Sequence, residues 1–394
     1  MSNTQIYTKP DKLLFVLAST LIGIGVILVY SLSMYTIERF DYNDLHFLYR
    51  QLGFGLLSIF IIWFLAHRDP KQYILPIGLI LFVGSFILII AMPFLPDFLV
   101  KEVGGAKRWI NLFGLSLSPV EFFKIGFIYF LAWSFSRKLG QHDNMGVSKE
   151  IIRFLPYAFL FIIIMFFVAI FQKELGQVAV MGATLLVMLL FAGSSAAFIL
   201  SLVGIGIFSF IVLVATQGHR IDRITSWWGS VQDYVLQFFP DFISSFLHIE
   251  VYKKAYQVGH SMNAIHHGGL FGVGLGSGQL KLGYLSEVHT DFILAGLAEE
   301  FGFFGVTIIS LLFLGLIMRI LQIAGKTEET TEFLFVLGIG LLIAFTFLLN
   351  AYGIRGLIPL KGIPVPFLSY GGSSMIATSI GIGMVLMISR KVKL

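Results

Sequence analysis

The chain has 394 residues, of which 57% are hydrophobic and only 12% are charged, whereas soluble domains carry about 25% charged residues. This composition excludes a soluble globular protein and predicts an integral membrane protein. The formal net charge of +5 is small for the length and favours a bias in cytoplasmic loops over nucleic-acid binding, while the absence of cysteine excludes disulfides, thiolate nucleophiles and Cys-ligated metals.

The apolar segments predict an all-α polytopic fold. A helix needs about 20 apolar residues to cross the hydrocarbon core, and ten segments meet that requirement. We expect them in one membrane domain over residues 1–394, with the first span uncleaved because its apolar run is longer than a signal-peptide core. The predicted spans are 13–36, 49–66, 73–95, 119–136, 154–171, 178–194, 196–216, 292–318, 333–353 and 374–390.

The distribution of Lys and Arg near the span ends gives the orientation. With both termini inside, the inner and outer segments carry equal numbers of these residues. Because the rule discounts long loops, the cations of the long outer loop do not count, and the remaining ones favour the inner side. We therefore expect both termini in the cytoplasm.

Only one outer segment, the loop 217–291, is long enough to build a structure outside the bilayer, and the outer segments 96–124, 217–300 and 355–374 together predict a polar cleft. The loop 217–291 contains Trp227-Trp228 and Phe238-Phe239-Pro240, which suit helices that lie in the membrane interface. The segment 355–374 is rich in Pro and Gly. Such backbone cannot cross lipid without hydrogen-bond partners, so we expect a re-entrant turn that lines a protein-walled cavity.

Asp291 is the sharpest candidate for chemistry, because it opens the eighth span from the outer side next to His289 and Thr290. An Asp at this position is also a common helix N-cap, and position alone does not separate the two interpretations. Glu299 lies roughly 12 Å deeper along the same helix. Glu299 and Glu300 must face the bundle interior, either as structural hydrogen-bond partners or as part of a polar cleft.

Two further clusters precede and open the fourth span. Glu121 and Lys124 are three residues apart, so they share a helix face within ion-pair range; a pair that only neutralises itself is the alternative to a functional one. Lys107 and Arg108 stand beside Trp109 at the outer interface. They are suited either to snorkelling at the headgroups or to gripping a phosphate.

Other motifs carry weaker signals. The glycines of 268–276 follow no strand pattern and face outside, so a nucleotide-binding loop is not expected. Close helix packing or close approach of the backbone to a ligand is expected instead. His260, His266, His267 and His289 lack a metal-binding spacing. Taken alone, the segment 172–176 (Gln-Lys-Glu-Leu-Gly) predicts only a tight outer turn.

Several stretches together resemble one family, the SEDS proteins (shape, elongation, division and sporulation) typified by FtsW and RodA. The resemblance covers almost the whole chain, the ten-span layout included. The stretches that carry it are Gly105-Ala106-Lys107-Arg108-Trp109-Ile110, Glu121 with Lys124, Glu174-Leu175-Gly176, Gly268 through Phe292, Ala298-Glu299-Glu300 and Lys361 through Ser374.

The resemblance implies a peptidoglycan glycosyltransferase that polymerises lipid II at the outer face of the bacterial cytoplasmic membrane. It implies a class B penicillin-binding protein as partner, together with other membrane proteins of the divisome or elongasome. The family's essential acid falls on Asp291, which we expect to be the general base, directly or through a divalent cation such as Mg²⁺ or Mn²⁺; no organic cofactor is expected. An ester intermediate on Asp291 is the mechanistic alternative.

The remaining polar residues of the cleft are expected to bind substrate. For the diphosphate we favour Arg108 over Lys124 and Arg355, and we add Glu121, Lys361, Glu299 and Glu300 to the binding set. The chain departs from the usual family pattern at three places. It has Leu-Ser-Glu at 285–287 where the family usually has Leu-Pro-Glu, Gln-Lys-Glu-Leu-Gly at 172–176 where Gln-Pro-Asp-Leu-Gly is usual, and Pro-Val-Glu at 119–121 where Pro-Ser-Glu is usual. These departures leave Asp291 untouched.

Three alternatives stay open at this point. Lys361 before Gly362 and the segment 281–285 look more like FtsW than RodA, which favours a role in cell division over elongation. A lipid II flippase would need a similar cleft but also a polar path across both leaflets. A scaffold that only activates its penicillin-binding partner would need no polar cleft.

Overall fold

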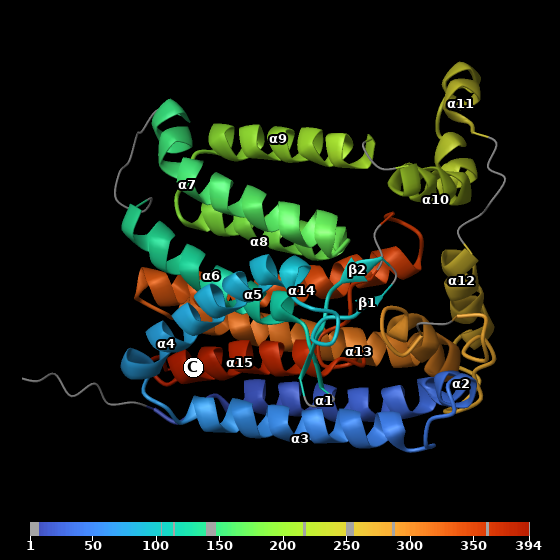
Figure 1. Cartoon of the computed structure of the whole chain (residues 1–394), viewed down its shortest axis with the longest axis horizontal. Coiled ribbons are helices and arrows are strands. Elements are labelled where there is room, and N and C mark those ends of the chain that lie inside the picture. The colour runs from blue at the N-terminus through green and yellow to red at the C-terminus, as the bar shows by residue number, and fades with distance from the viewer. Residues whose placement is uncertain are drawn as a thin grey trace, which may run out of the picture.

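The structure is a computed structural model that describes residues 8–103, 105–112, 115–138, 147–215, 218–249, 256–285, 288–359 and 362–393. Long helices run side by side along the longest axis of the molecule (Figure 1). Each of the ten predicted spans corresponds to helical structure, which confirms the all-α polytopic fold. The segments are α1 (Lys12–Leu32), α3 (His46–Ala66), α4 (Pro70–Leu79) with η1 (Ile80–Gly84) and α5 (Ser85–Ala91), α6 (Pro119–Lys138), α7 (Val147–Met165) with η3 (Phe166–Phe171), α8 (Leu175–Phe191), α9 (Ala196–Ala215), α13 (Ile293–Gly325), α14 (Thr330–Ile354) and α15 (Gly372–Ser389).

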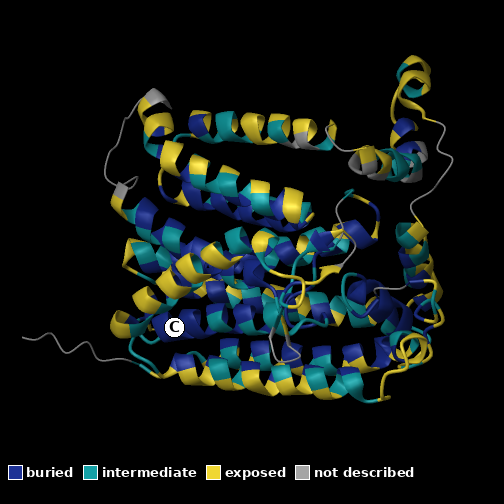
Figure 2. Cartoon of the chain, viewed as in Figure 1, coloured by how far each residue is buried: buried dark blue, intermediate teal, exposed yellow. Residues whose placement is uncertain are grey.

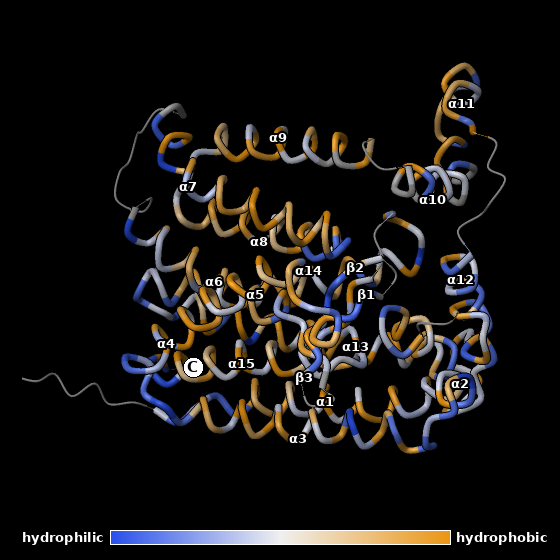
Figure 3. Tube along the Cα trace, viewed as in Figure 1, coloured by the Kyte–Doolittle hydropathy of each residue, from blue (hydrophilic) through white to orange (hydrophobic). Residues whose placement is uncertain are grey.

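Length and apolar composition support membrane crossing directly for most of these helices. Among the described residues, 7 helical segments are long and apolar enough to span a bilayer, and α8 and α9 are shorter apolar helices. The apolar residues lie along the middle of the rods and the hydrophilic ones gather at the two ends (Figure 3). This banding is what a bilayer requires of a multi-pass membrane protein.

The helices α15, α14 and α6 are largely buried and form the centre of the bundle, whereas α9 is largely exposed (Figure 2). Small residues let the helices approach closely. A side chain at Gly126 in α6 would lie 2.2 Å from the backbone nitrogen of Phe82, so η1 packs directly against the α6 backbone. Such contacts between backbones are typical of membrane helices, which gain little from the hydrophobic effect within lipid.

The helix α13 is interrupted at Gly302, whose φ of 65° and ψ of −164° are not helical. The interruption leaves backbone groups without helical partners. Phe303 N donates to Gly269 O (2.9 Å), and Val273 N donates to Glu299 O (3.0 Å). The glycine-rich loop after α12 therefore supplies hydrogen-bond partners to the backbone groups at the break in α13, which backbone at membrane depth requires.

Shorter elements cluster at one end of the bundle (Figure 1). Two antiparallel hairpins precede α6, with Val103 paired to Ala106 and Asn111 paired to Ser116. The helices α10, α11 and α12 lie at the same end (Figure 1), where Trp227 Nε1 of α10 donates to Gly356 O at 2.5 Å. The elements are α2 (Met34–Arg39), η2 (Met92–Phe94), β1 (Glu102–Val103), β2 (Ala106–Lys107), β3 (Ile110–Leu112), β4 (Leu115–Leu117), α10 (Gly218–Leu236), α11 (Asp241–Leu247) and α12 (Tyr256–Gly268).

The first and last described segments of the chain meet at the opposite end of the bundle. Thr8 N donates to Arg390 O (2.8 Å), and Asp11 N donates to Ser389 Oγ (3.2 Å). The Asp11 carboxylate also caps α1 and pairs with Arg319 at 2.7 Å. An even number of spans predicts this meeting, but the side of the membrane on which it lies stays a prediction.

Candidate functional site

A cavity of about 630 Å³ opens at the end of the bundle that carries the hairpins. Six segments that are distant in sequence supply its wall: the start of α3 with the residues before it, the hairpins with the start of α6, the turn before α8 with the start of α8, the start of α12, the turn before α13 and the segment before α15. Its described lining residues are Tyr42, His46, Phe47, Arg50, Phe54, Arg108, Trp109, Ser116, Ser118, Glu121, Lys173, Glu174, Gln177, Gln257, His289, Thr290, Asp291, Phe292, Gly362, Pro364, Tyr370, Gly371, Gly372, Ser373 and Ser374.

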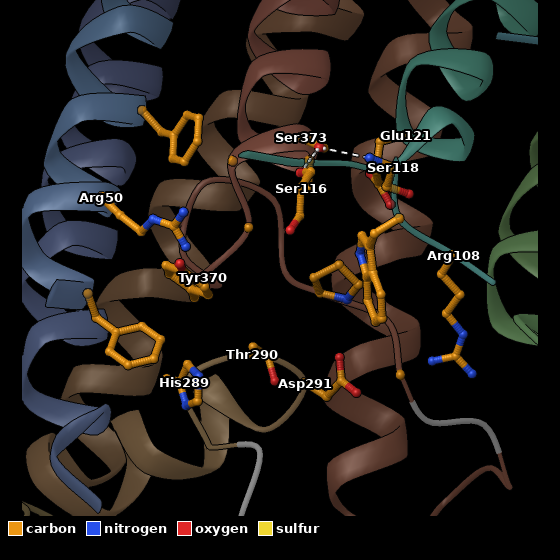
Figure 4. A pocket seen from close by; sticks show the side chains of 18 of the residues that line it. Arg50, Arg108, Ser116, Ser118, Glu121, His289, Thr290, Asp291, Tyr370 and Ser373 are labelled. Atoms are coloured by element: carbon orange, nitrogen blue, oxygen red, sulfur yellow. Dashed lines mark hydrogen bonds between the residues drawn. The ribbon is translucent and has the colours of Figure 1, made fainter. Parts of the chain in front are cut away.

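Asp291 lies in the turn before α13, and its carboxyl points into the cavity (Figure 4). The N-cap position of α13 falls on Phe292 rather than on Asp291, and the Asp291 side chain is part of the cavity lining. The backbone is fixed by Asn350, whose Nδ2 donates to both Asp291 O and Ile363 O at 2.7 Å. A Cβ at Gly362, where φ is +82°, would lie 3.6 Å from Asp291 Oδ2, so a glycine keeps that side of the carboxyl open.

Residues before α15 hold the turn that carries Asp291. Ser369 Oγ donates to Thr290 O (2.6 Å), and Tyr370 N donates to His289 O (2.8 Å). His289 packs edge-on against Phe47 with ring centroids 5.1 Å apart. Burial lowers the pKa of His289 to about 4, so the imidazole is neutral at pH 7 and contributes an aromatic surface instead of charge.

Arg108 lies on the opposite wall from α3. Its Nε donates to Gln172 O at 2.6 Å and lies 3.6 Å from Glu174 Oε1. Lys107 turns away from the cavity and pairs with Asp97 at 3.0 Å. Of the two cations that the sequence placed beside Trp109, only Arg108 is available to an anion in the cavity.

The predicted ion pair between Glu121 and Lys124 forms, with 2.9 Å between Oε2 and Nζ. Gln177 closes the group, because its Oε1 accepts from Lys124 (2.8 Å) and its Nε2 donates to Glu121 (3.1 Å). Glu121 and Gln177 line the cavity, whereas Lys124 lies behind them, outside the lining. The three side chains satisfy one another and form a rigid polar wall.

Glu174 is a cavity residue to which the sequence assigned no role beyond a turn. Burial, opposed by Arg108, raises the pKa of its carboxyl to about 7; Glu121 and Asp291 add to the rise and Lys124 opposes it. The signal in the sequence was weak, since only the match of 174–176 to the family pattern marked this turn. Lys173, which precedes it, has a φ of 55°, which shows that the turn is held in an unusual conformation.

The other predicted binding residues lie away from this cavity or outside the described residues. Glu300 is buried and pairs with Lys281 at 2.7 Å, and Ser31 Oγ donates to it. Glu299 accepts from Gln279 N (2.7 Å) and His267 (3.0 Å). The two glutamates therefore fit the structural interpretation rather than the binding set. Arg355 is exposed at the end of α14 and is not part of the lining, and Lys361 lies outside the described residues.

No group of three His, Asp or Glu side chains with metal-binding geometry occurs among the described residues. Asp291 could give a divalent cation one carboxylate, and the other ligands would have to come from substrate. This donor set suits Mg²⁺, which is often held by one or two carboxylates together with substrate phosphates.

The chain is similar over almost its whole length to proteins of one family. The model of the FtsW/RodA/SpoVE family, described as "Cell cycle protein", matches residues 11–394. A probable peptidoglycan glycosyltransferase FtsW of Helicobacter pylori is 45% identical over 385 residues, covering 97% of this chain and 99% of the relative. The stage V sporulation protein E of Bacillus subtilis is 34% identical over 389 residues, with 97% and 98% coverage.

Solved structures share the fold. A chain from a peptidoglycan synthase complex, described under "Structural coordination of polymerization and crosslinking", superposes with a TM-score of 0.70 at 21% identity, covering 98% of each chain. The rod shape determining protein RodA of Thermus thermophilus superposes with a TM-score of 0.63 at 22% identity, again over 98% of each chain.

Proposed function

Because the chain belongs to the FtsW/RodA/SpoVE family of cell cycle proteins, we propose that it is a peptidoglycan glycosyltransferase that polymerises lipid II. Relatives named as peptidoglycan glycosyltransferases cover nearly the full length of the chain. The reaction joins two lipid-linked sugars. The 4-hydroxyl of the acceptor attacks the anomeric carbon of the donor, and the donor's lipid diphosphate leaves.

The observation that carries the proposal is that Asp291 and Arg108 line the same cavity. A carboxylate and a guanidinium in one hollow can serve the two requirements of glycosyl transfer, which are removal of a proton and stabilisation of a departing anion. If the Asp291 carboxyl faced lipid, or if no cavity joined it to Arg108, the structure would not support the polymerase reaction.

Asp291 accepts the proton of the acceptor hydroxyl as the new carbon–oxygen bond forms. Arg108 stabilises the diphosphate as its bond to the anomeric carbon breaks, because the planar guanidinium donates two parallel hydrogen bonds to phosphate oxygens. Gln172 O and Glu174 hold Arg108 at the wall before substrate binds. An Asp291 ester in a double displacement remains the alternative route, and it uses the same carboxyl as nucleophile.

A divalent cation stays a prediction. Asp291 would hold it together with the diphosphate oxygens of the substrate, and the cation would neutralise charge on the leaving group. The assignments of Asp291 as base and Arg108 as anion-binding residue do not depend on it.

The cellular setting is proposed from the family and from the fold. We place the chain in the bacterial cytoplasmic membrane with both termini in the cytoplasm, so the cavity faces outward. The 45% identity to an FtsW supports septal wall synthesis during division over elongation. A class B penicillin-binding protein is the proposed partner, since a solved neighbour of this fold belongs to a complex of polymerisation and crosslinking.

The test is to incubate the purified chain with labelled lipid II, with and without the class B partner, and to separate the products by size. We expect glycan strands whose formation needs this chain. Movement of lipid II across a bilayer without strand formation would instead identify a flippase. Strands formed equally well by the partner alone would identify a scaffold.

A further inference from the structure

The wall of the cavity opposite Arg108 has no role in the mechanism above. It is built by the start of α3, which contributes His46, Phe47 and Arg50 to the lining, and by Tyr42 in the segment before that helix. These four residues form the α3 wall. Figure 4 shows Arg50 on one side of the cavity and Arg108 on the other, with Asp291 between them. The described lining thus presents a guanidinium on each side of the proposed base.

The α3 wall is aromatic as well as cationic. Tyr42 and His46 stack with ring centroids 4.5 Å apart and an interplanar angle of 12°. Phe47 meets the Tyr370 ring edge-on at 4.9 Å. Aromatic rings offer an apolar surface with polar edges, which suits the C–H face of a sugar ring, and an adjacent arginine suits an anionic group on the same molecule.

The proposed reaction requires two anionic substrates in the cavity at once. The donor must place its diphosphate at Arg108 and its anomeric carbon near Asp291. The acceptor must bring its hydroxyl to Asp291 from another direction, because the donor occupies the Arg108 side. The only part of the described lining with a guanidinium on the far side of Asp291 is the α3 wall.

We propose that the α3 wall is the acceptor subsite, in which Tyr42, His46, Phe47 and Tyr370 contact a sugar ring and Arg50 binds an anionic group of the acceptor. The inference rests on the proposed function and assigns each substrate to one side of Asp291, the donor to the Arg108 side and the acceptor to the Arg50 side. The anionic group is either the acceptor's diphosphate or a carboxylate of its stem peptide, and both present the oxygens that a guanidinium recognises.

The test separates the two substrates in a single-coupling assay. The donor is a labelled lipid II blocked at the 4-hydroxyl, which can donate but not accept. The acceptor is a lipid II analogue with a methylene group in place of the anomeric oxygen, which can accept but not donate. The KM of each is measured for the parent, Arg50→Ala, Arg50→Lys and Arg108→Ala.

For Arg50→Ala we expect the acceptor KM to rise by about 10- to 100-fold, the size of a lost charge-assisted contact, while the donor KM changes less than about twofold. Arg50→Lys keeps the charge without the planar fork and should show a smaller rise. Arg108→Ala should show the opposite pattern. An Arg50→Ala protein with a raised donor KM, or with an unchanged acceptor KM, would overturn the proposal.

Two controls protect this interpretation. Arg39 is exposed near the end of α2, outside the lining, with its guanidinium carbon 5.7 Å from the Phe40 ring centroid, so Arg39→Ala should leave both KM values unchanged. Tyr42→Ala, at a side chain 44% exposed, repeats the test if Arg50→Ala does not fold, and it too should raise only the acceptor KM.

An acceptor without its stem peptide identifies the anionic group. Persistence of the Arg50→Ala effect assigns the contact to the diphosphate, and its loss assigns the contact to a peptide carboxylate. Absence of all coupling by the folded parent protein, with or without its partner, would refute the proposed function itself, an outcome distinct from a failure of the subsite assignment.

Discussion

We predict that Glu174 makes donor binding at the proposed Arg108 site depend on pH in the neutral range. Burial raises the pKa of this carboxyl to about 7, against the opposing effect of Arg108, whose Nε lies 3.6 Å from Oε1. Below pH 7 the carboxyl is mostly neutral, and the charge of Arg108 is available to a diphosphate. Above pH 7 Glu174 is a carboxylate that competes for Arg108 and repels the substrate anion.

The magnitude follows from the titration. With a pKa of about 7, the protonated share falls from about 90% at pH 6 to about 10% at pH 8. Two like charges about 4 Å apart repel by about 4 kcal/mol at an effective dielectric constant of 20, well above the 1.4 kcal/mol that corresponds to tenfold in affinity. The neutral form therefore dominates donor binding, and the donor KM should rise by up to about tenfold between pH 6 and pH 8.

The assay is the single-coupling reaction at saturating acceptor, run at pH 6, 7 and 8 for the parent and for Glu174→Gln. Glutamine keeps the shape of the neutral carboxyl and cannot ionise, so the variant should bind donor at all three pH values as the parent does at pH 6. Other groups titrate equally in both proteins, and the difference between the two profiles isolates Glu174. Parallel profiles would refute the assignment.

Three substitutions test the packing around the site. Lys281→Met leaves Glu300 buried without its cation and should lower the free energy of unfolding by about 3–5 kcal/mol, measured by thermal unfolding in detergent. The double variant that also carries Glu300→Leu should recover most of this loss. An unchanged melting temperature for Lys281→Met alone would contradict the ion pair at 2.7 Å. Gly268→Ala would place its Cβ 1.8 Å from a carbonyl oxygen of α13 and should lower the melting temperature, whereas a parental value would show that the two backbones do not touch. Gly362→Ala adds strain of about 1–3 kcal/mol at its positive φ and a methyl group 3.6 Å from the Asp291 carboxyl, so strand synthesis should slow in a folded protein; full activity would show that this approach does not matter.

The sequence predicted the membrane helices and the position of Asp291 because both are local properties. The length of an apolar run locates a membrane span, and a carboxylate at the start of that span can be identified without knowledge of its spatial neighbours. The pair of Glu121 and Lys124 was equally accessible, since helix geometry alone brings residues three apart together. The ion pair at 2.9 Å confirms that local inference.

Residues whose role depends on distant segments could not be predicted in this way. Glu174 acquires its high pKa from burial, with a smaller contribution from Glu121 and against the opposing effect of Arg108, and only the fold brings these groups near it. Glu299 and Glu300 could be placed inside the bundle but not assigned, because their partners come from the loop after α12 and from α1.

Arg50 is another residue whose role depends on distant segments and could not be predicted from the sequence. In the sequence it is one cation near the start of a span, where interfacial Lys and Arg are common. Its position on the cavity wall follows from the packing of α3 beside α15 and the turn that carries Asp291.

The central claim is that the Asp291 carboxylate removes the proton from the acceptor, and the most direct test is the rate of strand synthesis by purified Asp291→Asn with its partner present. General-base assistance is typically worth about 10²–10⁴-fold, and asparagine preserves the size of the side chain. We expect a folded, membrane-inserted protein whose polymerisation rate falls by at least about 100-fold. Synthesis of glycan strands at the parental rate would contradict the account.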